Sequence, residues 1–148
     1  MAGQVTNQGA RTFLQAFFGN RTEQIPEQFW IALIGEREPN ISSTGSDIDE
    51  VDNILYPSYE RAQYQNISQN WQISSYDTIF NAQAIEFAIA NEGWGPVNYF
   101  GVCNEKTGGK LLAYGDLSTT QVIIEGDQIQ IDIGGIAFTI FNPAYEGD

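Results

Sequence analysis

Histidine is absent from this sequence and cysteine occurs once, which removes the side chains that most metal and nucleophilic sites use. Zinc sites rely mainly on histidine and cysteine, and the usual catalytic triad needs histidine as its base. Paired carboxylates can hydrolyse glycosides, but the sequence does not place any of the candidates Glu86, Glu92 and Asp116 side by side. We therefore expect no enzyme, no metal and no cofactor. Cys103 lies in an apolar strand pattern, so we expect a buried, inert thiol.

Positive charge is scarce as well. Six lysines and arginines face 19 aspartates and glutamates, which gives a formal net charge of −13. Such a chain repels phosphate backbones, so nucleic acid is not an expected partner. Residues 36 to 60 hold seven of the carboxylates and one cation, Arg37. We expect a solvated acidic patch there, with a contact for a basic partner surface as the alternative.

Residues 35 to 57 are predicted to form one long loop, because glycine, proline, serine, asparagine and acids separate only a few aliphatic residues. Loops of this length are usually binding elements or partly mobile. The candidate interaction residues in this loop are Asp47, Asp49, Glu50 and Asp52. They do not form a calcium loop, because Val51 occupies the third alternate position and neither the glycine nor the closing glutamate is in register.

Long apolar runs are also lacking. No stretch approaches the roughly 18 apolar residues of a membrane span, and the N-terminus has no basic segment followed by an apolar run. We therefore expect no membrane partner and no secretion signal, a mature chain that begins at or near Met1, and synthesis in a host cytoplasm. The sequence shows neither repeats nor coiled-coil heptads.

Residues 7 to 19 predict a short helix with an apolar face. Phe13 and Phe17, like Leu14 and Phe18, are spaced at i and i+4. Asn7 is the expected N-cap, and Gly19 with Asn20 the expected stop. We favour a face that covers an open end of the domain's own core, with docking on a neighbouring subunit as the alternative.

Most of the remaining chain predicts strands. Residues 29 to 34 read FWIALI and indicate a central strand buried on both faces. Weaker patterns predict strands at the segments 59–67, 72–79 and 79–89, the last with a helix over 81–90 as its competitor. Toward the C-terminus we expect short strands at 121–124, at 128–133, where Ile129, Ile131 and Ile133 alternate with polar residues, and at 136–141.

Residues 94 to 117 predict a β-hairpin, with Thr107, Gly108 and Gly109 at its bend. Trp94, between two glycines, is expected to be a packed plug at the sheet edge. Hairpin-linked strands with one helix indicate a single domain over residues 1–148: a mainly β, antiparallel sandwich or barrel, jelly-roll-like, with an N-terminal helix and arm over 1–28. The residues expected to shape the hairpin are Trp94, Gly95, Gly101, Gly108, Gly109, Leu111, Leu112 and Gly115.

The hairpin and a few residues upstream resemble small bacteriophage virion proteins that are often labelled tail fibre proteins. In the second half of the chain the matching residues are Trp94, Gly95, Val97, Phe100, Gly101, Thr107, Gly108, Gly109, Leu111, Leu112, Gly115, Leu117, Gly126 and Asp127. Upstream, residues 29–33 resemble the family's first long strand, and Tyr59 with Arg61 resembles its Gly-Tyr-x-Arg element, although Ser58 replaces the glycine.

The resemblance implies a non-enzymatic structural role in a virion, either as a capsid-decorating subunit or as a neck or tail-fibre adaptor. The implied partners are other proteins of the capsid, neck or tail, together with further copies of the chain as a homo-oligomer. Residues 1–28 and 35–57 are the expected contact regions. The alternative is a carbohydrate-binding β-sandwich module for host-surface attachment, since its tryptophans and tyrosines could stack on sugars.

Overall fold

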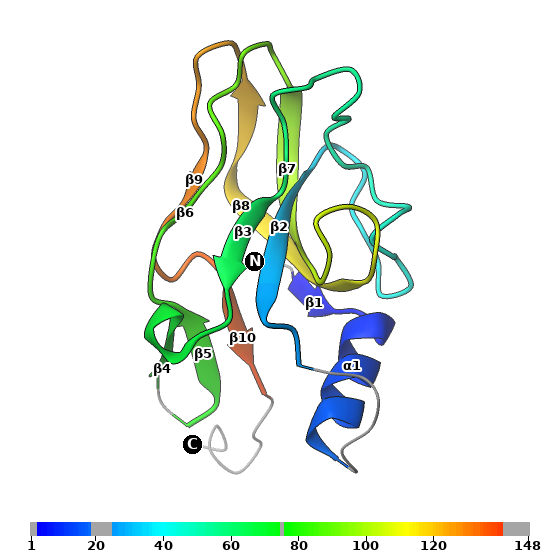
Figure 1. The fold of residues 1–148 in the computed structure, drawn as a ribbon, viewed down its shortest axis with the longest axis vertical. Coiled ribbons are helices and arrows are strands. Elements are labelled where there is room, and N and C mark those ends of the chain that lie inside the picture. Colours follow the sequence, from blue (N-terminus) through cyan, green and yellow to red (C-terminus); the bar gives the residue numbers. More distant parts are fainter. Residues whose placement is uncertain (1–2, 19–24, 75, 141–148) are drawn as a thin grey trace.

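The computed structural model describes residues 3–18, 25–74 and 76–140, which form antiparallel β-sheets and one α-helix near the N-terminus (Figure 1). The predicted mainly β, sandwich-like class is therefore confirmed. The elements are β1 Gly3–Val5, α1 Asn7–Phe17, β2 Gln28–Ile34, β3 Ala62–Gln65, a 3₁₀ turn η1 Ser68–Asn70, β4 Trp71–Ser74, β5 Thr78–Asn81, β6 Ile85–Glu86, β7 Gly95–Cys103, β8 Leu111–Ile123, β9 Gln130–Ile131 and β10 Ala137–Thr139.

The strands form a five-stranded sheet in the order β1-β8-β7-β2-β3, a three-stranded sheet β10-β5-β4 and a two-stranded sheet β6-β9. β2 pairs with both β7 and β3 and is central, as its continuous apolar run predicts. Ile31 and Leu33 belong to the main core, whereas Ala32 packs on the other face with Cys103. The prediction of a strand buried on both faces is confirmed.

The predicted hairpin is present as β7 and β8. Gly108 and Gly109 adopt φ angles of 59° and 70°, which side chains with a Cβ rarely adopt, so glycine is required at the bend. The prediction of a separate strand at 121–124 is wrong. The segment is instead the end of β8, which runs to Ile123: the pairing with β7 shifts register after Asp116 and resumes at Gln121, and Ile123 pairs with Gly95 at the start of β7.

The strands predicted at 72–79 and 79–89 are also wrong in their extent. β4 and β5 form a hairpin instead, and β5 ends at Asn81, whose side chain is fully buried. The Asn81 amide donates to the carbonyls of Gln83 and Asp132 and accepts from the amide of Ile136. These three bonds replace ladder bonds and turn the chain out of the sheet. The competing helix over 81–90 is not formed either.

The alternating isoleucines at 129–133 form much less strand than their pattern predicts. Only β9 is formed, paired with β6. Ile131 is buried, but Ile133 is exposed because the chain turns at Gly134, which adopts a φ of 81°. β10 pairs with β5 and is shorter than the predicted strand 136–141, whose last residue lies outside the described residues.

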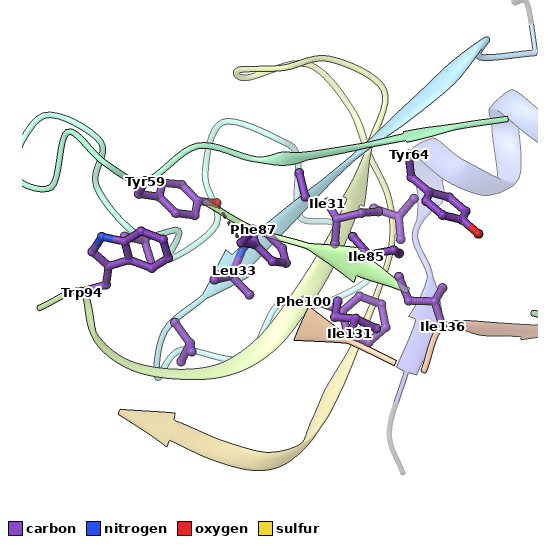
Figure 2. Packing of buried hydrophobic residues seen from close by; sticks show 14 of the residues in the cluster. Ile31, Leu33, Tyr59, Tyr64, Ile85, Phe87, Trp94, Phe100, Ile131 and Ile136 are labelled. Carbon is purple, nitrogen blue, oxygen red and sulfur yellow. Dashed lines mark hydrogen bonds between the residues drawn. The ribbon is translucent and has the colours of Figure 1, made fainter. Parts of the chain in front are cut away.

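The main core lies between the five-stranded sheet and the segments that carry β6, β9 and Ile136. Figure 2 shows Phe87 beside Leu33 near the middle of this cluster, with Tyr59 and Trp94 at one end and Tyr64 at the other. The rings of Tyr59 and Trp94 meet edge to face at 5.4 Å. Trp94 is buried, as predicted for a packed plug.

Helix α1 begins at Asn7, the first residue of the predicted range, but its N-cap lies one residue earlier than predicted. Its N-cap is Thr6, not Asn7: the Thr6 hydroxyl accepts from the amide of Gly9 at 3.0 Å and donates to the carbonyl of Leu111 on β8. One side chain therefore caps the helix and anchors it to the sheet. The predicted stop at residues 19 and 20 lies outside the described part of the chain.

Gly9→Ala tests how closely α1 lies on β8, because a Cβ at this position would meet the carbonyl oxygen of Leu112 at 1.9 Å. Helix propensity alone predicts that alanine stabilises by about 1 kcal/mol. We expect the opposite, a loss of roughly 1–3 kcal/mol in the free energy of unfolding, because the helix must shift. Urea denaturation measures it, with Gln15→Ala as the control on the same helix. A more stable Gly9→Ala protein would contradict this packing.

Candidate functional site

The apolar face of α1 is exposed. Phe13, Leu14, Phe17 and Phe18 have exposed fractions of 54%, 53%, 69% and 60%. The prediction that this face covers the domain's own core is therefore wrong. The helix packs on the sheet instead through the face that carries Gly9 and Thr12, both of which are buried. Because Gly9 has no Cβ, the helix lies in close contact with the backbone of Leu112 there.

The exposed phenylalanines form a ridge. The rings of Phe13 and Phe17 stack at a centroid distance of 5.8 Å, and those of Phe17 and Phe18 meet edge to face at 4.9 Å. Aromatic pairs at such distances hold one another in place. The helix therefore presents an ordered apolar surface.

An apolar groove of about 670 Å³ lies beside this ridge, between α1 and the sheet β10-β5-β4. Helix α1 and the strands β10, β5 and β4, which lie on either side of the groove, are in the lower part of the view in Figure 1. Seven residues that line the groove have large apolar side chains that are about half exposed or more. Phe17 and Phe18 of the ridge are exposed to the same degree but lie outside the lining. We call these nine the apolar end: Val5, Phe13, Leu14, Phe17, Phe18, Ile25, Ile73, Tyr76 and Ile140.

Sequence reasoning found the helical half of the apolar end through its i, i+4 spacing and missed the other half. Ile73 and Tyr76 lie in a segment read as one weak strand, and Ile140 at the end of another. No local pattern distinguishes them from core residues. Only the pairing of β5 with β4 and β10 brings them together opposite the helix.

The four acids singled out in the long loop make bonds within the protein. Asp49 accepts from the amides of Glu36 and Arg37, each at 3.0 Å. Asp47 accepts from the amide of Thr44, and Asp52 accepts from the amide of Ile54. Glu50 accepts from the side chains of Tyr59 and Arg61. The structure therefore does not gather these acids into a ligand set, and their role as an interaction patch stays a prediction.

Arg61 is the most connected side chain of this region, and it is only 4% exposed. Its Nε and Nη2 donate to the two carboxylate oxygens of Glu50, both at 2.8 Å. Its remaining N–H groups donate at 2.9–3.0 Å to the carbonyls of Gly45, Glu105 and Gly108. A guanidinium has five N–H donors, so Arg61 uses all of them to join the long loop to the hairpin tip.

The surroundings of Arg61 shift the pKa values of two groups. Burial lowers the pKa of the Arg61 guanidinium, but the hydrogen bonds and charge of Glu50, together with the nearby Cys103 and Tyr59 side chains, outweigh this and the net direction is upward. Burial and the adjacent Glu50 carboxylate raise the pKa of Tyr59 well above its ordinary value. The Tyr59 hydroxyl donates to Glu50 at 2.6 Å and accepts from the amide of Leu33. Both groups keep their protons, which suits a structural network.

Ser58, which replaces the glycine of the Gly-Tyr-x-Arg element, forms hydrogen bonds that a glycine could not form. Its hydroxyl donates to the Glu92 carboxylate and accepts at 3.0 Å from the indole N–H of Trp94. The hydrogen bond from Ser58 lowers the pKa of Glu92, partial burial opposes it, and the bond from Trp94 adds to the lowering. The Ser58 side chain thus holds Trp94 in place.

The tryptophans do not form an exposed platform for sugars. Trp94 is buried, and Trp30 and Trp71 are half-buried. Trp71 packs against the rings of Phe29, Tyr64 and Phe138 at 5.3–6.3 Å. A sugar-binding platform of this kind would need two exposed and coplanar indoles, and the three tryptophans do not supply such a pair.

Within residues 3–18, 25–74 and 76–140, no three histidine, cysteine, aspartate or glutamate side chains are placed to hold a metal ion. No helix among the same residues is long and apolar enough to cross a bilayer.

Arg61→Ala should reduce the free energy of unfolding by about 3–5 kcal/mol, because it leaves Glu50 partly buried without its cation. Arg61→Lys should rescue only part of the loss, since one ammonium cannot reproduce five directed bonds. Arg37→Ala is the matched control: Arg37 lies at the surface of the same loop and donates one hydrogen bond, to the carbonyl of Asp47. Chemical denaturation measures all three. Equal losses for Arg61→Ala and Arg37→Ala would contradict the network.

Cys103 should resist thiol reagents in the folded protein, because it is fully buried and burial raises its pKa to about 12. An unfolded cysteine has a pKa of about 8.5. Above this pH only the unfolded chain loses the thiol proton, so stability should fall as pH rises. Labelling with an aromatic disulfide at pH 8 should need denaturant, whereas Ile124→Cys, at an exposed position, should label one thiol at once. Rapid native labelling of Cys103 would contradict its burial.

Comparison with known proteins gives one family. No curated protein matches the chain. A family model described as Podophage GP4 fiber I protein gp80 matches residues 4–139, a span that includes both the Arg61 network and nearly all of the apolar end. This match confirms the resemblance to phage tail fibre proteins. The chain belongs to the podophage GP4 fiber I protein gp80 family and is a structural protein of a phage virion.

Proposed function

We propose that this chain is a non-enzymatic adaptor subunit of the virion, which folds as one domain and joins a fibre at the neck or tail to other virion proteins through its apolar end. The match to a fibre family supports a role in a fibre assembly. The sequence has neither coiled-coil nor repeat patterns, which supports an adaptor rather than the shaft of the fibre. The family match also favours this role over capsid decoration.

The observation that carries the proposal is the apolar end itself. Phe13 on α1 is 54% exposed and Ile73 on β4 is 70% exposed, and both line one groove whose described lining contains a single charged side chain, Asp77. Exposed apolar surface of this extent commonly marks a protein interface. Residues 1–28, which include α1, are therefore the principal contact region.

The long loop is the second contact region in this proposal. Arg61 fixes it to the hairpin tip, and Ile54 and Leu55 remain exposed on it. A loop held in this way presents its surface to a partner without first having to become ordered, which reduces the entropic cost of binding. The loop's acids contribute general negative charge to a contact with a basic surface.

A phage carrying Phe13→Ser/Phe17→Ser in this chain should incorporate at least about tenfold less of the protein into purified particles. The substitution removes two rings from the contact while leaving the buried side of α1 unchanged. Quantitative immunoblotting against the major capsid protein measures it. Ile124→Ser, which removes a similarly exposed side chain outside the groove, should assemble normally.

Immunogold labelling of intact particles then gives the location. Label at the neck or tail supports the adaptor role, whereas label over the head supports decoration. Full incorporation of Phe13→Ser/Phe17→Ser would refute the apolar end as the assembly surface. Absence of the protein from particles, together with binding to host polysaccharide, would favour the carbohydrate-binding module instead.

A further inference from the structure

A second, smaller hollow lies along β2, β3 and β6, and it shares no lining residue with the apolar groove. Its volume is about 220 Å³. That is less than a drug-sized ligand needs and enough for a single side chain. We call it the Trp30 pocket. The side chains that give it its chemistry are Trp30, Glu60, Gln63, Glu86 and Lys106.

Strand alternation places these side chains together, because outward and inward positions alternate along each strand. Trp30 on β2 is paired with Gln63 on β3, and Glu86 is the outward residue of β6, which lies beside β3. Glu60 comes from the segment before β3, and Lys106 from the hairpin tip. Strand pairing therefore fixes most of the pocket.

The indole of Trp30 is the aromatic wall of the pocket. It is half-buried, because it packs against a small cluster that includes Ala32, Cys103 and Leu111, and the rest of its surface lines the pocket. A ring held in this way offers its π surface to a cation, and tryptophan is the best ring for this interaction. Arginine is the cation found most often in such contacts.

The carboxylates of the pocket also favour a cation. Glu86 is exposed and belongs to neither of the two ion pairs in the part of the chain that the structure describes. Glu60 pairs with Lys106 at 3.6 Å, and the two side chains are 59% and 60% exposed. Such an exposed pair contributes little to stability, so Lys106 can give way to a better-placed cation. Two carboxylates and one loosely held ammonium leave the pocket negative.

Arg61, which lines the inner wall, does not offset this charge. Its five donors are taken by Glu50 and by three backbone carbonyls, and the Glu50 carboxylate neutralises its guanidinium. The chain as a whole carries −13, which attracts cationic groups and repels phosphates and acidic sugars. The charge of the pocket and that of the whole chain therefore favour the same class of ligand.

Of the two basic side chains, arginine fits the pocket better. Its guanidinium is planar, so it can stack on an indole while its edge donates two parallel hydrogen bonds to a carboxylate. The ammonium of lysine is a compact point charge and cannot do both. Arginine and tryptophan are also the side chains that most often carry the binding energy of protein interfaces.

We propose that the Trp30 pocket binds the guanidinium of an arginine side chain that another virion protein presents, with Trp30 against its face and Glu86 and Glu60 as its acceptors. This inference goes beyond the proposed function. It gives the chain a second recognition site, with a basic partner, whatever protein the apolar end contacts.

Titration of the nitrogen-15-labelled full chain with N-acetyl-arginine amide, followed by NMR, tests the ligand chemistry. The indole N–H signal of Trp30, assigned with Trp30→Phe, should shift and saturate with a Kd on the order of 1 mM, since one side chain makes few contacts. Kd should rise with added sodium chloride, which screens the charges. N-acetyl-citrulline amide, which has a similar shape without the charge, should not bind.

Three exposed positions separate the pocket from the general negative charge of the chain. Glu86→Gln should weaken binding at least about fivefold, because the hydrogen bond loses its ionic acceptor. Glu125→Gln, the matched control outside the pocket, should bind as the wild type does. Lys106→Ala should tighten binding about twofold, because it removes the cation that competes for Glu60. A merely structural role of these side chains would not produce that opposite pair of effects.

An affinity that Glu86→Gln leaves unchanged would overturn the proposal, as would a Trp30 signal that does not move at about tenfold higher probe concentrations. Spermidine or N-acetyl-lysine amide that binds as tightly as the arginine probe would refute the guanidinium as the ligand. Binding of a neutral disaccharide in place of the probe would make the pocket a sugar site and overturn the proposal as well.

Cross-linking within assembled particles tests the source of the arginine. A photoreactive benzoylphenylalanine at Ala88, an exposed residue of the pocket lining, should cross-link to a segment of another virion protein that contains arginine. Glu86→Arg should abolish this cross-link, because it places a cation where the partner's guanidinium would bind. A cross-linked segment without arginine, a cross-link that survives Glu86→Arg, or no cross-link at all would overturn the proposal.

Discussion

The buried ion pair between Arg61 and Glu50 is the interaction on which the positions of the long loop and the hairpin tip depend. Removing both charges from water is costly, and the pair is favourable only because all five N–H donors of the guanidinium find acceptors. Three of those acceptors are backbone carbonyls on two loops that are distant in sequence. Together with the hydrogen bond from the Gly45 amide to the Gly109 carbonyl, the Arg61 side chain fixes a long loop and a hairpin tip that have little regular structure of their own.

The two ends of the domain differ in how their groups are satisfied. Around Arg61, polar groups that would otherwise need a partner meet one another inside the chain, so this region is complete in the monomer. At the apolar end, side chains that would ordinarily be buried remain in contact with water. In the proposed assembly this division separates a complete scaffold from the face that contacts a second protein surface.

Sequence patterns predicted the parts of the fold that local chemistry determines. The continuous apolar run became a central strand, and the glycines at 108 and 109 became a bend. Strand lengths failed where one buried side chain decided them: Asn81 at the end of β5 bonds the nearby Gln83 carbonyl and two backbone groups, of Asp132 and Ile136, that only the folded chain brings near. The apolar end was half predicted, because helical spacing is visible in sequence whereas the approach of β4 and β10 to α1 depends on pairing between β5 and β10, which are far apart in sequence.

The anchoring of α1 has a consequence for the order in which the chain folds during synthesis. Thr6 is fixed to the carbonyl of Leu111, which is 105 residues further along the chain. At about 5–20 residues per second the ribosome needs roughly 5–20 s to supply that strand. During this interval Gly9 and Thr12 lack the strand against which they are later buried. Helix α1 is therefore synthesised well before the strand on which it docks, and its docking is a late step of folding.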